Sequence, residues 1–148
     1  MANSRKMLGR CVAGKEISKD SNIGEWGRPV SNRPTQEIAV DERRYENGED
    51  PRLLDIIEIR MRGHVPYAHQ TENHLIDAEY CWVKGGIVTW DELEAAVEPF
   101  GGTLWFDGFH SYNGENDRIP EAQTLELENS LTLVETEDLV TAVAHVDA

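Results

Sequence analysis

Short β-prone runs, separated by glycine- and proline-containing breaks, are the feature that most constrains the fold of this 148-residue chain. The clearest run lies at 56–62, where apolar residues alternate with charged ones. A period of two places the apolar side chains on one face of a strand and the charges on the other. Further β-prone runs lie at 10–17, 75–83, 103–106, 124–128, 130–134 and 139–146. We therefore predict about six or seven short strands.

The best helix signal lies at 90–98. Thr89 is a suitable N-cap, and Glu92 three residues later completes a capping box. Pro99 ends the helix. The intervening segments, interpreted as loops, are 18–36, 41–52, 64–74 and 107–123. Short strands, long loops and one helix favour a mainly β protein, either a small barrel or a mixed β-rich α+β fold, over a parallel βαβ sheet.

The charge of the chain is unevenly distributed. There are 28 acidic and 14 basic residues, so the net charge is -14. This excess of acid argues against a surface that tracks a phosphate backbone over its whole extent. Residues 1–33 nevertheless hold seven basic against three acidic residues, whereas 34–148 hold seven against 25. If any face attracts an anion, the N-terminal segment builds it; the alternative is a scatter of solvated charges.

The sequence predicts a cytoplasmic protein without a membrane segment. No run approaches the roughly 18–20 apolar residues that span a bilayer. The first ten residues lack the apolar stretch of a secretory signal. The 2 cysteines, Cys11 and Cys81, are too few for a disulfide framework. A reducing compartment is therefore expected.

Metal, cofactor and catalytic signatures are not found in the sequence. His64, His69 and His74 are spaced five apart, whereas structural zinc sites place paired ligands two to four residues apart. We therefore interpret them as surface or hydrogen-bonded histidines. Cys11 follows Arg10 but lies in an apolar run, which favours a small core residue over a nucleophile. A small nucleotide hydrolase is a third-ranked alternative because no catalytic constellation supports it.

Two cationic segments carry the strongest chemical signal. The first is Asn3-Ser4-Arg5-Lys6, followed by Arg10, and the second contains Trp26, Arg28 and Ser31. Arginine beside tryptophan is a common arrangement for holding a phosphate and stacking a base. The alternative is that Trp26 packs in the core and Arg28 forms a surface ion pair.

These segments resemble the dual OB-containing domain family of prokaryotic proteins. The matching motifs are NSRK at 3–6, GRCVAG at 9–14, W-x-R-P-V-S at 26–31, QTENHLID at 70–77, NDRIP at 116–120 and SLTLVE at 130–135. The resemblance implies OB-like β-barrels, nucleotide or nucleic-acid binding, and a role beside prokaryotic conflict or defence systems. It also implies one compact OB-like domain over 1–148, with a shortened dual unit as the alternative.

We therefore predict a non-catalytic module that binds a nucleotide or a short single-stranded nucleic acid. The expected ligand-binding residues are Asn3, Ser4, Arg5, Lys6, Arg10, Trp26, Arg28, Ser31, Gln70, Glu72 and Asn73. The cations would meet phosphates, Trp26 would stack, and Gln70, Glu72 and Asn73 would read polar edges. The main alternative is a protein-interaction module, because 121–148 holds seven acidic residues and no Lys or Arg. Such a region would dock a basic partner or block a nucleic-acid groove by mimicry.

Two structural expectations accompany this prediction. The NSRK segment is expected to be ordered and packed rather than a loose tail, although chain ends are usually poorly ordered unless they are tied down. The residues expected to be buried together are Val12, Ile57, Ile59, Met61, Trp105, Leu131 and Leu133.

Overall fold

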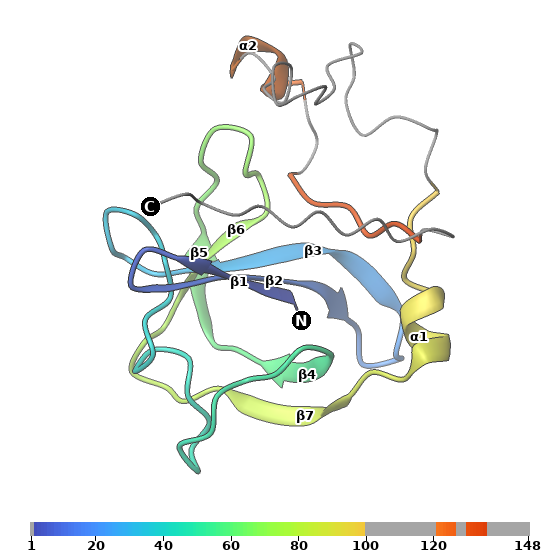
Figure 1. Cartoon of the computed structure of the whole chain (residues 1–148), viewed down its shortest axis with the longest axis horizontal. Coiled ribbons are helices and arrows are strands. Elements are labelled where there is room, and N and C mark those ends of the chain that lie inside the picture. Colours follow the sequence, from blue (N-terminus) through green and yellow to red (C-terminus); the bar gives the residue numbers. More distant parts are fainter. Residues whose placement is uncertain (1, 100–120, 127–129, 136–148) are drawn as a thin grey trace, which may run out of the picture.

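The structure is a computed structural model that describes residues 2–99, 121–126 and 130–135 (Figure 1). Its strands are β1 (Ala2–Lys6), β2 (Gly9–Ile17), β3 (Ile23–Val30), β4 (Asp55–Glu58), β5 (Met61–His64), β6 (Asn73–Ile76) and β7 (Val83–Ile87). Its helices are α1 (Trp90–Glu94) and α2 (Glu121–Thr124). The protein is mainly β, as the sequence predicted.

The strands form two sheets. The larger sheet has five strands in the order β1-β2-β3-β6-β5, and the smaller one pairs β4 with β7. Neighbouring strands are antiparallel except β3 and β6, which run parallel. A parallel pair requires a long connection. Here that connection contains β4 and β5. The first strand of the smaller sheet therefore lies, in the sequence, between two strands that are neighbours in the larger sheet.

The first hairpin joins β1 to β2 and fixes the N-terminal segment. Lys6 pairs with Gly9 across the turn, and Arg5 lies directly opposite Arg10. The backbones of Arg10 and Ile38 exchange two hydrogen bonds of 2.9 Å. A side chain on Gly9 would place its Cβ 2.5 Å from the Ile38 carbonyl oxygen, so this close approach requires glycine. The prediction that NSRK is ordered is confirmed.

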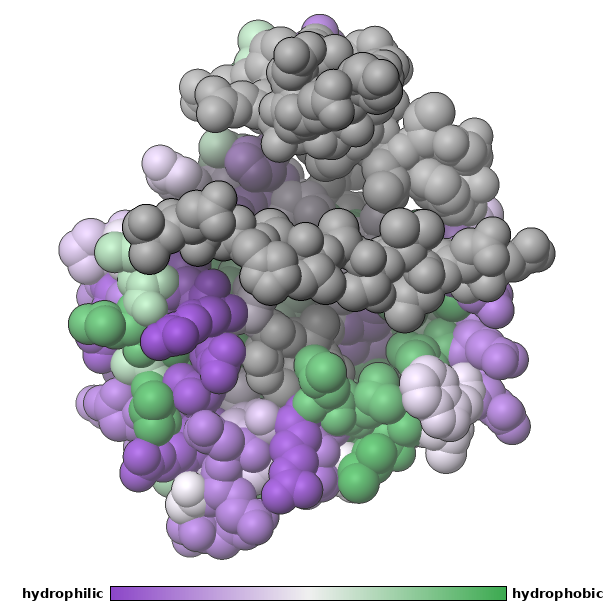
Figure 2. Space-filling model, viewed as in Figure 1, coloured by the Kyte–Doolittle hydropathy of each residue, from purple (hydrophilic) through white to green (hydrophobic). Residues whose placement is uncertain are grey.

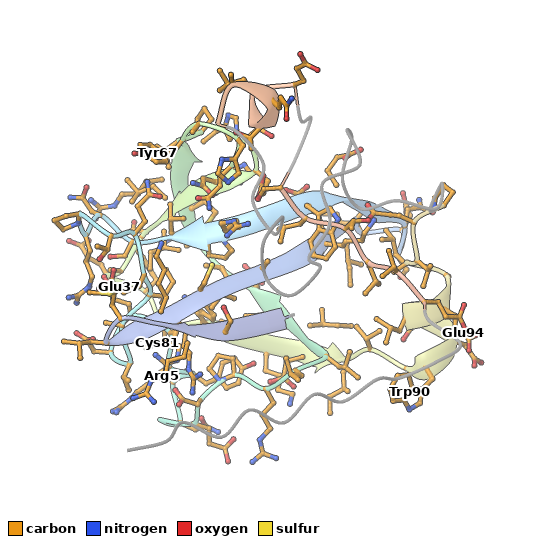
Figure 3. The ribbon with its side chains drawn as sticks, turned by 45° about the horizontal axis from the view of Figure 1, so that its top comes forward. Arg5, Glu37, Tyr67, Cys81, Trp90 and Glu94 are labelled. Carbon is orange, nitrogen blue, oxygen red and sulfur yellow. The ribbon has the colours of Figure 1, made fainter. Side chains whose placement is uncertain are left out.

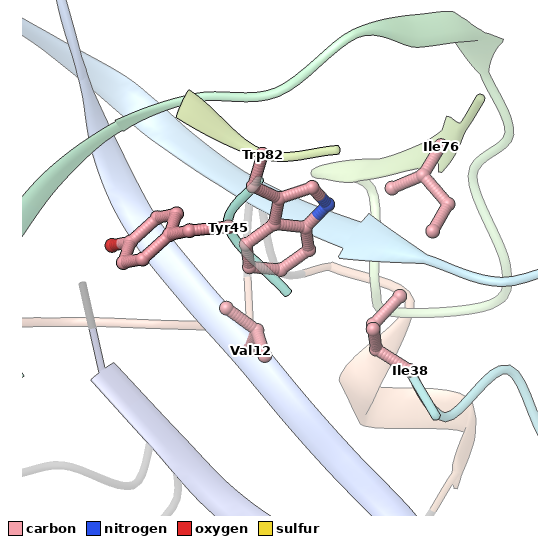
Figure 4. Packing of buried hydrophobic residues seen from close by; sticks show 5 residues of the cluster. All are labelled: Val12, Ile38, Tyr45, Ile76 and Trp82. Atoms are coloured by element: carbon pink, nitrogen blue, oxygen red, sulfur yellow. The ribbon is translucent and has the colours of Figure 1, made fainter. Parts of the chain in front are cut away.

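The core lies between the two sheets (Figure 4). Its buried members are Val12, Ile38, Tyr45, Ile76 and Trp82, and Ile57 and Ile59 pack against it. Val12 and Ile76 belong to the larger sheet and Ile57 to β4, so the cluster holds the sheets together by apolar burial. The expected core is confirmed for Val12 and in part for Ile57 and Ile59. Trp105 lies outside the described residues.

The alternating run at 56–62 does not form one strand. It divides into β4 and β5, with Ile59 between them, and the two halves join different sheets. Because the alternation is interrupted, Met61 does not follow Ile57 into the core and is 38% exposed. The expectation that Met61 is buried was therefore wrong.

The prediction of a loop over 18–36 was also wrong, because β3 lies within it. Proline is tolerated in this strand because of its register. The Arg28 N–H donates to the Glu72 carbonyl on the β6 side, at 2.9 Å. At the next position, Pro29, a backbone N–H would point toward β2, but the β2–β3 pairing has already ended at Gly27. No donor is required there.

The helix prediction was right at its start and too long at its end. Thr89 and Glu92 form the expected capping box, with the Thr89 N–H donating to the Glu92 carboxylate at 2.8 Å. The helix ends at Glu94, and the Ala96 N–H bonds the carbonyl three residues back. No helix in the described ranges is long and apolar enough to cross a bilayer.

The C-terminal strand predictions differ from the described segments. Residues 121–126 form α2 and a turn where a strand was expected from 124, and 130–135 have no regular structure. Leu131 and Leu133 are only half-buried and are not members of the core cluster, so the expectation that they are buried there was wrong. The predicted strands at 103–106 and 139–146 lie outside the described residues.

Candidate ligand-binding site

Arg28 lies on β3 in a buried ion pair. Its guanidinium contacts the Glu72 carboxylate at 2.9 Å, and it donates to the Ser130 hydroxyl at 2.6 Å and to the Cys11 sulfur at 3.1 Å. The Ser130 N–H donates to the other Glu72 oxygen at 3.2 Å. Arg28 is only 8% exposed. Its donors are thus occupied by groups of the chain itself.

The Glu72 carboxylate remains ionised because it is well supplied with donors. Burial acts to raise the pKa of Glu72, but hydrogen bonds from Ser130 and Arg28 outweigh it and hold the pKa below its usual value. A buried charge with a bonded partner is tolerated, whereas an unpaired one is costly.

A second carboxylate, Glu98, accepts hydrogen bonds beside the neighbouring part of the same sheet face. Lys15 donates to it at 2.8 Å, the Trp26 indole N–H at 3.1 Å and the Leu133 N–H at 2.8 Å. The Lys15 ammonium also lies 5.5 Å from the centre of the Trp26 ring. Burial acts to raise the pKa of Glu98, but the hydrogen bonds from Lys15, Leu133 and Trp26 lower it to about 2.

Residues 130–135, which we call the strap, are held on the sheet by these two carboxylates (Figure 1). Glu72 bonds the strap at Ser130, and Glu98 bonds it at Leu133 in both directions, since the Glu98 N–H also donates to the Leu133 carbonyl at 3.0 Å. Arg28 and Trp26 therefore help to fasten a segment of the chain. Their predicted roles in gripping and stacking a ligand stay predictions.

Asn73 is the least exposed of the predicted site residues. It is fully buried on β6, directly opposite Arg28 in the β3–β6 register. Its amide nitrogen lies 3.3 Å from the Gln70 oxygen and 3.5 Å from the Gln36 oxygen, and its own oxygen has no hydrogen-bond partner among the described residues. Ser31 is also buried but donates elsewhere, to Glu42 at 2.7 Å. The structure thus brings together Arg28, Gln70, Glu72 and Asn73.

The first hairpin holds a different group of cations, Arg5, Lys6 and Arg10. Arg5 is exposed, Arg10 is half-buried, and neither forms an ion pair within the described residues. Arg5 lies at the end of the molecule opposite Trp90 and Glu94 of α1 (Figure 3). Lys6 is close enough to Glu37 to help lower the pKa of that carboxyl, after the larger effect of the Thr35 hydroxyl. The remaining predicted residues, Asn3 and Ser4, belong to the same strand.

A depression of about 420 Å³ lies beside Tyr45 and Trp82. Its rim carries Glu46 and Glu49, which repel a phosphate. Lys84 lines it as well, but this lysine is paired with Asp55 at 2.5 Å. The depression is therefore poorly suited to a nucleotide.

An apolar surface lies over β4, β7 and the start of α1, where green side chains gather in Figure 2. Val83 and Ile87 are 55% and 62% exposed, and Trp90 is 72% exposed. Asp91 and Glu92 follow in the first helical turn. This surface offers apolar and acidic contacts, so it does not suit a phosphate either.

Sequence reasoning missed the residues that complete the buried pairs. Glu98, Lys15 and Ser130 were not singled out, and no local pattern marks them, because 83 residues separate Lys15 from Glu98 and 58 separate Glu72 from Ser130. No group of three or more His, Cys, Asp or Glu side chains suited to a metal occurs in the part of the chain that the structure describes.

The structure defines a mainly β protein in which Arg28, Glu72 and Glu98 are bonded to other groups of the chain. The family described as "Dual OB-containing domain" matches residues 1–147, and the chain belongs to this family. The resemblance drawn from the motifs is thereby confirmed. No curated protein and no solved structure matches the chain significantly. OB-fold domains commonly bind oligonucleotides and other nucleic acids.

Proposed function

We propose that this protein binds a nucleotide or a short single-stranded nucleic acid without catalysing its conversion, and that Arg5 and Arg10 contact the phosphates. The observation that carries the proposal is the direct cross-strand pairing of these two arginines, with no carboxylate bound to either within the described residues. Like charges directly opposite each other on two strands are destabilising. A bound phosphate would relieve that repulsion and accept charge-assisted hydrogen bonds from both guanidinium groups.

The position of the hairpin supports the same proposal. Arg5 is exposed, so a ligand reaches it without displacing any described segment. Gly9 and the two Arg10–Ile38 backbone bonds fix the hairpin against the rest of the fold. The arginines are therefore held on a rigid element, which lowers the entropic cost of binding.

In this proposal the remaining predicted residues divide into two groups. Asn3, Ser4 and Lys6 lie on the same strand as Arg5 and are offered as secondary contacts. Arg28, Glu72 and Trp26 act by fastening the strap, and they reach a ligand only if the strap moves away. An accessory role in a prokaryotic conflict system remains a prediction from the family.

The docking alternative concerns the acidic region 121–148, of which the structure describes 121–126 and 130–135. Within the strap, Ser130 and Leu133 bond to Glu72 and Glu98 of the same chain. These contacts support an internal role for the described part, so the nucleic-acid proposal ranks first.

The test is a titration of the purified protein with mono- and dinucleotides and short labelled single strands, followed by fluorescence anisotropy at low salt. Arg5→Ala and Arg10→Ala should each weaken binding by roughly 10- to 150-fold, the usual effect of losing one charge-assisted contact. The effect should shrink as salt rises. Lys19→Ala is the matched control, because Lys19 is an exposed cation on the neighbouring β2–β3 turn and forms no ion pair with another described residue. No binding at millimolar ligand, or equal losses for all three variants, would contradict the proposal.

A further inference from the structure

His64 and His74 face each other across two paired strands. They are direct partners in the antiparallel register of β5 and β6, and their ring centres lie 5.0 Å apart with 41° between the ring planes. Ten residues separate them in the sequence, so their proximity comes from strand pairing and not from a spacing motif. His64 is exposed and His74 half-buried, which leaves the pair open to solvent on one side.

Backbone carbonyls fix the proton on each ring. The His74 Nδ1 lies 2.9 Å from the Glu72 carbonyl oxygen, and the His64 Nε2 contacts the Thr71 carbonyl oxygen. A carbonyl can only accept, so these two nitrogens carry the hydrogens of the neutral rings. The other two nitrogens, Nδ1 of His64 and Nε2 of His74, then carry lone pairs and have no hydrogen-bond partner among the described residues. Metal-binding histidines are usually held in this way, with the second N–H donated to a carbonyl or carboxylate.

The spacing of the rings suits one shared metal ion. An ion about 2.1 Å from the free nitrogen of each ring lies about 3.2 Å from each ring centre. With both free nitrogens turned toward it, rings centred 5.0 Å apart subtend about 100° at the ion. That angle is close to the tetrahedral value preferred by Zn²⁺. The nearest cation on β5, Arg62, is already paired with Asp77 at 2.9 Å, which reduces its repulsion of a metal.

We propose that His64 and His74 bind a divalent transition-metal ion of the Zn²⁺ class, with its remaining coordination positions open to water or to a ligand. Imidazole nitrogen is a preferred donor for such ions. The proposal is independent of the nucleic-acid function, because it uses neither arginine of the first hairpin. It revises the expectation drawn from the five-residue spacing, which considered ligands along the chain and not across a hairpin.

Isothermal titration of the chelator-treated full chain with Zn²⁺ tests the assignment. We expect His64→Ala and His74→Ala each to weaken binding by roughly a hundredfold, since losing even the outer partners of ligating histidines costs about 10–100-fold. His69→Ala is the matched control, because His69 lies in the connection between β5 and β6, outside the pair, and it should leave binding unchanged. Absence of Zn²⁺ binding at millimolar concentration overturns the proposal, and so does binding that neither variant weakens.

A second measurement needs no variant. Nitrogen-15 NMR of the imidazoles in the metal-free protein should show His64 as the Nε2–H tautomer and His74 as the Nδ1–H tautomer. Adding Zn²⁺ should then shift the resonances of these two rings and not those of the other three among the chain's 5 histidines. The opposite tautomers, or shifts confined to other histidines, overturn the assignment even if either alanine variant fails to fold.

Discussion

Arginine has two different environments on the same sheet. On β3, Arg28 is buried and bonded to Glu72, Ser130 and Cys11. On the first hairpin, Arg5 and Arg10 face each other without a carboxylate among the described residues. All three belong to the basic N-terminal 33 residues, so local charge does not distinguish them. They differ in whether a segment distant in the sequence places a carboxylate beside the arginine.

This difference separates a structural cation from one available to a ligand. A buried charge must keep its partner, because an unpaired charge in the interior is strongly destabilising. An exposed charge is solvated by water and can exchange that water for a phosphate. Substitutions in the two regions should therefore change different properties, stability in one and affinity in the other.

The largest effect is expected for Glu72→Ala. The change leaves Arg28 buried without its partner, so the free energy of unfolding should fall by about 3–5 kcal/mol. Chemical denaturation measures this. Glu79→Ala is the control, because the Glu79 side chain is 79% exposed and, among the described residues, its carboxylate makes only a 3.9 Å ion pair with Arg62. A loss for Glu72→Ala as small as that of the control would show that Arg28 does not depend on this pair.

The second-largest effect is expected from acid, which should lower the free energy of unfolding by protonating Glu98. The pKa of Glu98 is about 2 in the folded protein and ordinarily 4.5, so the folded state favours the charged form. A carboxyl whose pKa is lower in the folded state stabilises the fold at pH values above its unfolded pKa. That stabilisation is lost as the pH falls toward its folded pKa. The free energy of unfolding should thus decline between about pH 4.5 and 2, by at most about 3 kcal/mol for this group.

Glu98→Gln identifies the contribution of this group to the acid transition. It removes the titration and should flatten the decline measured by thermal melts at stepped pH. An unchanged pH profile would assign the acid sensitivity to other carboxyls, such as Glu72, whose pKa is also lowered despite its burial.

A smaller loss is expected for Gly9→Ala, which disturbs the hairpin itself. The new Cβ would lie 2.5 Å from the Ile38 carbonyl oxygen, a backbone atom that cannot rotate away. We expect a loss of about 1–3 kcal/mol, as for other overpacked sites. Gly63→Ala on β5 meets nothing within 4 Å and should have little effect on the melting temperature. Equal effects would mean that strand propensity, and not the close approach, decides the result.

The smallest effect has the opposite sign. Arg5→Gln removes one of two facing positive charges, so the ligand-free protein should become more stable by a few tenths of a kcal/mol at low salt. Urea denaturation at low and high salt detects the change, which should disappear as salt screens the repulsion. Destabilisation by Arg5→Gln would indicate that Arg5 has a structural partner after all, and that the two regions do not differ as described.

The sequence predicted those parts of the fold that depend on neighbours along the chain. The capping box at Thr89 needs only four residues, and the strand at 10–17 has its own β-prone pattern, so both were found. Continuous alternation at 56–62 suggested one strand, but whether β4 and β5 share a sheet is decided by distant partners. Pro29 argued for a loop only because the register that removes the need for its N–H is not visible in the sequence.

The site was less predictable for the same reason. Motif resemblance selected Arg28 and Glu72 as residues of interest, but it did not show that they are bonded to each other. Their pairing spans 44 residues, and the Lys15–Glu98 pair spans 83. Contacts of this length follow from the strand order, which local patterns do not encode.

The strap also has a consequence for the order in which the chain is made. All seven described strands lie within the first 87 residues, so a nascent chain can complete its ladders before it reaches 130. Until then, Glu72 lacks its bonds from Ser130, and Glu98 lacks the amide of Leu133. Strand pairing can thus be complete during synthesis before the two carboxylates have all their hydrogen bonds. A chain truncated before the strap would have its strands paired, but Glu72 and Glu98 would lack the hydrogen bonds that the strap donates.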